Sequence, residues 1–243
     1  MPWDFALILL ALAVLVPWRG TVRMRQLLAR PQLATTDRLA LYASTIAFQW
    51  FAVAVVAWRS HARGLTSAEL GVSLVQPDRV WEAALVLTVL LALSQLLSLR
   101  YVARLPPERQ GFLRLMASKV LPQNLIESLA FTALCATVAL CEEFLYRGFV
   151  FAALDRATSS AGIAAAGSAL LFSLAHLYQG KRGLRMTFIV GLVFGVSRIW
   201  TGSIAPTIVT HLVVDLLAGL VAPRWLRSSP SQNLLGADPT AKE

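Results

Sequence analysis

The chain has 243 residues, of which 57% are hydrophobic and 14% are charged, and its mean hydropathy is +0.64. This composition is too apolar for a water-soluble domain, and at about 20 residues per membrane helix the length accommodates six to eight helices and no large domain outside the membrane. The net charge of +9 does not indicate nucleic-acid binding, because the basic residues lie in short loops between apolar runs and not on one folded face.

Seven apolar runs predict seven membrane-spanning helices. The first run follows Asp4 and precedes several arginines, which is the reverse of the charge order in a secretory signal peptide, so we expect it to be retained. The predicted helices cover residues 5–18, 39–58, 80–99, 125–154, 161–178, 186–200 and 204–222. We therefore expect an all-α polytopic membrane protein, a bundle of about seven transmembrane helices.

The segments outside these runs divide the chain into three parts. Residues 100–123 mix basic and apolar residues too finely for a membrane helix, which indicates a loop with an amphipathic helix on the cytoplasmic membrane surface. Residues 1–119 then form an N-terminal part with this interfacial segment, and residues 120–224 form a core of four helices. The polar tail, 225–243, is expected to be disordered.

The loops predict the orientation of the chain in the membrane. Alternate loops carry 16 Lys and Arg residues on one side and six on the other. By the positive-inside rule, the N-terminus lies outside and the C-terminus lies in the cytoplasm. The 19 arginines against three lysines are typical of a GC-rich bacterial gene, so the expected location is the inner cell membrane.

Two short patterns concern cross-links and packing. Cys135 and Cys141 lie six residues apart on one predicted helix and point about 240° apart, so they are not expected to form a disulfide, and no CxxC spacing indicates a metal site. Gly191 and Gly195 form a GxxxG pattern that serves either packing within the bundle or a dimer. The oligomeric state is left open.

Ionisable residues are costly inside a membrane and therefore mark candidate functional sites. The predicted helices carry them in three groups, namely Glu142, Glu143 and Arg147; Phe172 and His176; and His211 and Asp215. In the first group, Glu143 and Arg147 are spaced i and i+4 in the favourable order for an ion pair. This pairing leaves Glu142, rotated by about 100° around the helix, to face another partner, although the whole group also fits a purely structural contact between helices.

The two histidine groups also have a structural and a functional interpretation. His176 is either a hydrogen-bonded residue between helices or a catalytic group, and Phe172 is most simply a packing residue. His211 and Asp215 are again i and i+4, so the carboxylate can fix the imidazole tautomer in either case. Because the turn before the fifth helix falls near residues 157–160, Glu142 and His176 are expected at similar depth. His211 comes out about 10 Å shallower, an offset that tilt, or a loop dipping into the membrane around 201–203, would have to close.

These residue types suit hydrolysis of an amide bond. A desolvated carboxylate beside a histidine can deprotonate a water molecule, and a second group of donors can hold the oxyanion that forms on the carbonyl. The same residues permit zinc chemistry, with Glu142, His176 and His211 as ligands, but the HExxH spacing is absent.

In this order the groups read EExxxR, FxxxH and HxxxD, and they resemble the motifs of the CPBP or Abi family of intramembrane proteases. That family includes the type II CAAX prenyl proteases and bacteriocin-processing enzymes. The flanking stretches LPQNLIE, RGFVFAAL and GLVFGVSRIWTGSIAPTIVTH fit as well. The resemblance covers roughly residues 120–222, with a weaker similarity in GLTSAELGV at 64–72.

The resemblance implies an endopeptidase in which Glu142 and His176 activate water while His211, with residue 215, holds the oxyanion. Glu143 and Arg147 would support this site, and no metal or other cofactor would be needed. The family often has Asn at the last position, whereas Asp215 cannot donate a hydrogen bond unless it is protonated. We therefore expect Asp215 to orient His211, with the imidazole alone facing the oxyanion.

The partners expected from the sequence are the lipid bilayer and a peptide or membrane-protein substrate. A lipidated CAAX substrate follows only from the analogy, and a bacterial chain favours a leader peptide or the terminal segment of a membrane protein. A non-catalytic scaffold or immunity protein with the same fold is the main alternative function. A transporter is disfavoured because the chain has no inverted repeat.

Overall fold

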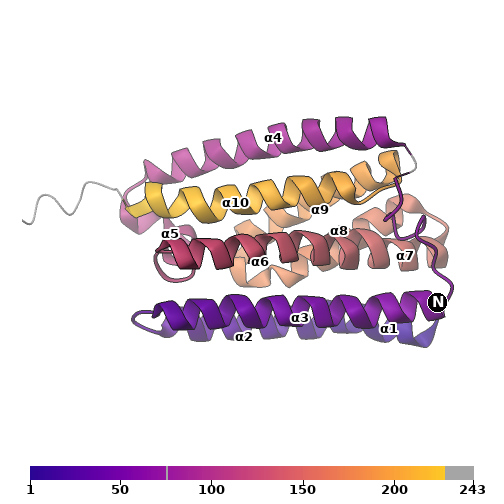
Figure 1. The fold of residues 1–243 in the computed structure, drawn as a ribbon, viewed down its shortest axis with the longest axis horizontal. Helices are drawn as coiled ribbons and strands as arrows, with labels where there is room; N and C mark the ends of the chain where they lie inside the picture. Colours follow the sequence, from indigo (N-terminus) through magenta and orange to yellow (C-terminus); the bar gives the residue numbers. More distant parts are fainter. Residues whose placement is uncertain (75, 228–243) are drawn as a thin grey trace, which may run out of the picture.

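The computed structural model describes residues 1–74 and 76–227, and nearly all of them are helical. The long helices share one axis and form a bundle, with α4 and α10 on one side, α2 and α3 on the other, and α6 and α8 between them (Figure 1). The described ranges contain no strand. The prediction of an all-α polytopic membrane protein is confirmed.

Six helices are long and apolar enough to cross a membrane, and α8 is a shorter apolar helix. The helices are α1 (Trp3–Leu10), α2 (Val16–Ala29), α3 (Thr35–Ala62), α4 (Pro77–Ala103), α5 (Gly111–Lys119), α6 (Leu125–Glu143), α7 (Phe151–Thr158), α8 (Ala161–Ala175), α9 (Gly180–Thr201) and α10 (Ala205–Arg227). Two π-helical stretches, Ala11–Leu15 and Phe144–Val150, join α1 to α2 and α6 to α7 into continuous helices, and short 3₁₀ turns cover Pro107–Arg109 and Leu177–Gln179. Residues 225–227, which the sequence predicts to be part of the tail, still belong to α10, and the rest of the tail lies outside the described residues.

The first membrane helix is longer than its apolar run predicts. It extends from Trp3 to Ala29, although Pro17 lies within it. Pro17 lies two residues after the π-helical stretch, where the change in backbone hydrogen bonding accommodates a residue without an N–H. The helix therefore continues past the proline, and its arginine-rich end lies against the rest of the bundle.

Two connections, the one before α8 and the one before α10, lie close in sequence to the functional residues. Ser159 adopts a left-handed conformation (φ 52°) and the Ser160 side chain caps α8, so the turn falls where the sequence predicts it. The connection from α9 to α10 is buried at Thr201 and Ser203, and the Ile204 amide donates to the Gly71 carbonyl over 2.8 Å. This buried connection covers the segment for which the sequence suggests a loop that dips into the membrane.

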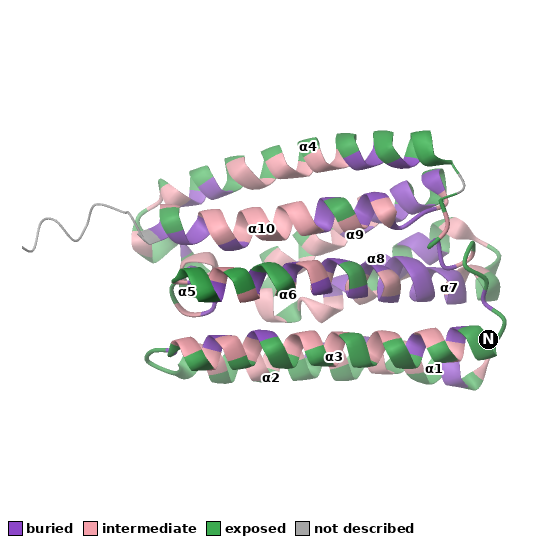
Figure 2. Cartoon of the chain, viewed as in Figure 1, coloured by how far each residue is buried: buried purple, intermediate pink, exposed green. Residues whose placement is uncertain are grey.

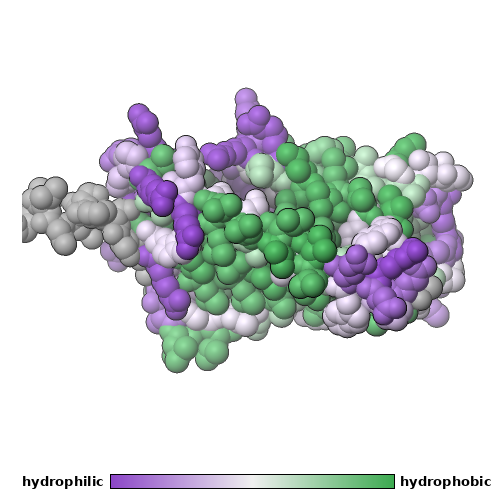
Figure 3. Space-filling view, turned by 90° about the horizontal axis from the view of Figure 1, so that it is seen from above, coloured by the Kyte–Doolittle hydropathy of each residue, from purple (hydrophilic) through white to green (hydrophobic). Residues whose placement is uncertain are grey.

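The surface of the bundle matches a membrane environment. Hydrophobic side chains form a band between two hydrophilic ends (Figure 3), and many of the exposed residues on α3 and α4 are apolar (Figure 2). At one end, Lys119 of α5 donates to the carbonyls of Leu28 and Arg30 over 2.6 Å, so the predicted interfacial segment contains a helix that meets the α2–α3 turn. Arg38 and Glu127 form an ion pair of 2.8 Å nearby.

Close helix packing explains the GxxxG pattern. A Cβ atom at Gly191 would lie 3.0 Å from Ala169, and one at Gly195 would lie 2.9 Å from Ala165, so both glycines let α9 approach α8. The pattern therefore serves packing within the bundle. Cys135 and Cys141 are buried free thiols, as expected from their spacing.

Candidate active site

Two adjacent glutamates at the end of α6 face different surroundings. Glu142 is partly exposed and lines a cavity of about 200 Å³, whereas Glu143 is completely buried. The helix changes to π-helical geometry immediately after them, a local distortion that is frequent at functional sites. As the predicted rotation of about 100° implies, the two side chains point in different directions, so that Glu142 faces a cavity and Glu143 is sealed from solvent.

Glu143 connects two of the three predicted groups. Its Oε1 accepts hydrogen bonds from Arg147 Nη1 at 3.1 Å and from His211 Nδ1 at 3.0 Å. The predicted i, i+4 pair with Arg147 is therefore present, and both of its side chains are fully buried. The sequence gives no indication of the further contact with His211, because it joins helices 68 residues apart.

Aromatic rings enclose the Arg147 guanidinium. Its central carbon lies 4.1 Å from the ring centre of Phe172 and 5.2 Å from that of Phe194. Such cation–π contacts offset part of the cost of burying the charge. The Phe172 ring also packs against His176 and His211, with ring centres 4.7 and 6.0 Å apart. Phe172 therefore packs against Arg147 and both histidines.

Glu142 has a hydrogen-bond partner that the motifs do not contain. Gln49 of α3 donates from Nε2 to Glu142 Oε1 over 2.9 Å. The other oxygen, Oε2, is buried and has no hydrogen-bond partner among the described residues. Gln49 thus fixes one carboxylate oxygen and leaves the second available. Its signal in the sequence is a polar residue within the apolar run 39–58.

His176 follows the last residue of α8 and lines the same cavity as Glu142. Its Nδ1 lies 2.9 Å from the Phe172 carbonyl, which requires Nδ1 to carry the proton in the neutral ring. Nε2 is then left as an acceptor. The prediction that Glu142 and His176 lie at similar depth agrees with their common cavity, which the side chain of Tyr178 also lines.

His211 lies between two carboxylates and does not line that cavity. Its Nδ1 is bound to Glu143, and its Nε2 lies 3.6 Å from Asp215 Oδ2, which is longer than a hydrogen bond. The structure therefore adds Glu143 as the residue that holds the ring, with Asp215 at its other edge. Asp215 lies within electrostatic range of both Glu142 and His176.

The three residues considered as zinc ligands have different contacts in the structure. In the described part of the chain, no three His, Cys, Asp or Glu side chains are placed to hold one ion. Of the three candidates, His211 has its Nδ1 engaged by Glu143 and its Nε2 beside Asp215, while Glu142 and His176 face the cavity. A larger cavity of about 550 Å³ lies elsewhere, between the first turn of α6 and the last turns of α10, and contains none of the predicted residues.

Together, the fold and these contacts define a multi-pass membrane protein with a carboxylate–histidine site enclosed by its helices. Residues 124–217 match the family model described as type II CAAX prenyl endopeptidase Rce1-like, which covers 94 of the 243 residues and all three motifs. The match confirms the resemblance drawn from the motifs and is to a family of proteases. No curated protein and no solved structure matches the chain.

Proposed function

We propose that the protein is an intramembrane endopeptidase that hydrolyses a peptide bond near the membrane surface with a water molecule activated by Glu142 and His176. The observation that carries this proposal is the free Oε2 of Glu142, which is held in place through Oε1 and lines a cavity shared with His176. A fixed carboxylate beside a histidine is suited to take a proton from water.

In the proposed reaction, Glu142 and His211 have different roles. Glu142 accepts a proton from water, and the resulting hydroxide attacks the carbonyl carbon of the substrate. Glu143 accepts a hydrogen bond from Nδ1 of a protonated His211, and the Nε2–H group of the same ring donates to the oxyanion. Asp215 helps to orient the ring. Collapse of this intermediate breaks the C–N bond, and the proton taken up by the Glu142–His176 pair passes to the leaving amine.

Cleavage assays with purified protein test this proposal. The substrates are fluorescent CAAX-type prenyl peptides and unprenylated leader-type membrane peptides, and the enzymes are wild type and Glu142→Gln, with and without a strong chelator. We expect cleavage that requires Glu142 and survives chelation. Loss of activity on chelation with rescue by zinc would overturn the metal-free route. Equal behaviour of wild type and Glu142→Gln would favour a non-catalytic scaffold or immunity protein.

The proposed location is the inner cell membrane, with the N-terminus outside and the C-terminus in the cytoplasm. The 16 Lys and Arg residues within 19–38, 100–119, 181–185 and 224–242 support this orientation. Reporter fusions at the two termini, one active only in the cytoplasm and one only outside it, test the orientation. The reverse pattern of activity would contradict it.

A further inference from the structure

A cavity of about 550 Å³ lies away from the proposed active site, where α6 begins and α10 ends. Its walls include Leu125 and Ser128 of α6 and Gly219, Pro223 and Arg224 of α10. The volume is within the range of about 300–1,000 Å³ that is usual for sites that bind small molecules. Since none of the motif residues lines this cavity, the proposed reaction does not use it.

Pro223 interrupts the backbone hydrogen bonding of α10 at this cavity. In an α-helix the N–H of each residue donates to the carbonyl four residues earlier, and proline has no N–H. Because Pro223 lies inside α10, the Gly219 carbonyl loses its usual helical donor, and both residues line the cavity. Ser128 provides a second acceptor, since its hydroxyl already donates to the Asn124 carbonyl over 2.8 Å. The cavity therefore offers two acceptors to hydrogen-bond donors of a ligand.

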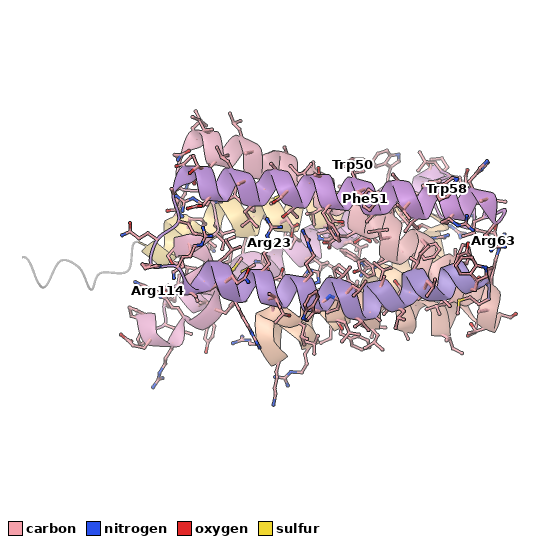
Figure 4. All side chains as sticks on the ribbon, turned by 90° about the horizontal axis from the view of Figure 1, so that it is seen from below. Arg23, Trp50, Phe51, Trp58, Arg63 and Arg114 are labelled. Carbon is pink, nitrogen blue, oxygen red and sulfur yellow. The ribbon has the colours of Figure 1, made fainter. Side chains whose placement is uncertain are left out.

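The cavity also has a positively charged surrounding. Arg224 lines it and is exposed, and guanidinium groups bind phosphate through charge-assisted hydrogen bonds. Arg114 of α5 lies at the same end of the bundle (Figure 4), where its Nη1 donates to the Leu226 carbonyl of α10 over 3.3 Å. The segment 100–119 carries five basic residues in all, namely Arg100, Arg104, Arg109, Arg114 and Lys119. A fitting ligand combines a phosphate with hydrogen-bond donors.

The depth of the cavity in the membrane indicates that this ligand is a lipid. Leu125 is the first residue of one candidate membrane span, and Leu226 is the last residue of another. The cavity between these two helix ends therefore lies at the boundary between the hydrocarbon layer and the headgroups. One turn deeper, Leu129 of α6 is an exposed apolar residue that can contact an acyl chain. Basic residues beside a membrane surface attract anionic lipids.

We propose that this cavity binds the headgroup of phosphatidylglycerol, with the phosphate at Arg224 and a headgroup hydroxyl donating to the Gly219 carbonyl. The inference requires the bundle to lie in a membrane and does not depend on the proposed reaction. Phosphatidylcholine is the natural comparison, because its headgroup has no net charge and its trimethylammonium group has no N–H. A lipid that binds between α6 and α10 should also raise the unfolding temperature of the protein.

Lipid titrations of the delipidated, full-length protein in detergent, followed by native mass spectrometry, measure the affinity. The probes are phosphatidylglycerol and phosphatidylcholine with identical acyl chains. We expect phosphatidylglycerol to bind about tenfold to one-hundredfold more tightly. Arg224→Gln should remove this preference and leave phosphatidylcholine binding unchanged. Arg104→Gln is the matched control, because it removes an exposed cation of segment 100–119 that does not line the cavity, and it should keep the preference.

A second variant, Pro223→Ala, tests the backbone acceptor separately from the charge. The alanine supplies the N–H that donates to the Gly219 carbonyl, so the affinity for phosphatidylglycerol should fall about twofold to tenfold. The unfolding temperature without lipid should not fall, because alanine is far more favourable than proline inside a helix. Weaker lipid binding without a loss of stability would support the acceptor, whereas unchanged binding would overturn its role.

Three further outcomes would overturn the lipid site. Equal affinity for the two phospholipids would show that the cavity does not distinguish their headgroups. An equal loss in Arg224→Gln and Arg104→Gln would show a general attraction between basic residues and anionic lipid. Competition by soluble glycerol phosphate at the concentrations at which the lipid binds would assign the cavity to a soluble phosphate. None of these measurements involves peptide cleavage, so this inference and the proposed function can fail independently.

Discussion

The two neighbouring glutamates at the end of α6 lie in opposite surroundings, one on each side of the helix. On the side of α2 and α3, Glu142 lines a cavity, is held by one neutral amide and keeps one oxygen free. On the side of α8, α9 and α10, Glu143 is completely buried. Its Oε1 is shared between Arg147 and His211, and its Oε2 has no hydrogen-bond partner among the described residues. The first arrangement leaves a carboxylate that can exchange a proton with a ligand. The second gives a fixed charge that holds other residues in place.

The largest expected effect comes from removing the free carboxylate. Glu142→Gln should lower kcat by about 10²–10⁴-fold, because the amide cannot accept a proton from water. The thermal stability of the variant should stay close to wild type, since the side chain lines a cavity and keeps its shape. Initial rates and thermal unfolding in detergent measure both quantities, with Glu82→Gln on the exposed face of α4 as the control. Substantial residual cleavage would remove Glu142 from the reaction.

The neighbouring substitution should show the opposite profile. Glu143→Gln leaves the buried Arg147 without a charged partner, and breaking such a pair costs about 3–5 kcal/mol of unfolding free energy. The variant should therefore unfold at lower temperature or denaturant concentration than wild type, whereas Glu142→Gln should not. If both variants are equally stable, the contrast between a sealed and an accessible glutamate is wrong.

The amide of Gln49 tests how the accessible carboxylate is positioned. Gln49→Leu removes a hydrogen bond to a charged group, which contributes about 1.5–3 kcal/mol, so kcat should fall about tenfold to one-hundredfold. Trp50→Leu is the matched control, because the adjacent side chain lies on the outer face of α3 (Figure 4) and is 48% exposed. A loss of stability in Gln49→Leu without a change in kcat would mean that the amide is structural only.

Asp215 is expected to have a smaller influence because it stands 3.6 Å from His211 Nε2. If it orients the ring, Asp215→Asn should lower kcat about twofold to fivefold, as expected for a weak charge contact. His211→Gln, measured in parallel, gives the effect of losing the ring itself. Unchanged or increased activity in Asp215→Asn would show that the amide can face the oxyanion and that Asp215 does not orient His211.

The sequence predicts the helices well because their signal is local. The apolar runs and the i, i+4 spacing of Glu143 and Arg147 depend only on nearby residues, and both are found in the structure. The contact of Glu143 with His211 and the hydrogen bond from Gln49 depend on how distant helices pack. The sequence leaves the placement of the α9–α10 connection open, since its burial relies on a hydrogen bond from the Ile204 amide to the distant Gly71 carbonyl. Periodicity carries no information on such contacts.

The ion pair of Glu69 and Arg156 provides a water-exposed counterpart to Glu143 and Arg147. Arg156 donates to Glu69 over 2.5 and 2.8 Å, and with two bonds from Thr66 it lowers the pKa of Glu69 to about 2 from 4.5. A lowered pKa stabilises the fold at pH values above about 4.5, and this contribution is lost as the pH falls toward 2.

The measurement is the difference in unfolding midpoint between wild type and Glu69→Gln from pH 7 to pH 3. The difference should be small, because both side chains are more than one third exposed, and it should shrink as the solution becomes acidic. Addition of salt should reduce it as well, whereas the Glu143→Gln effect should resist salt because that pair is sealed from solvent. A Glu69→Gln effect that is independent of both pH and salt would show that this contact stabilises the loop through packing and not through charge.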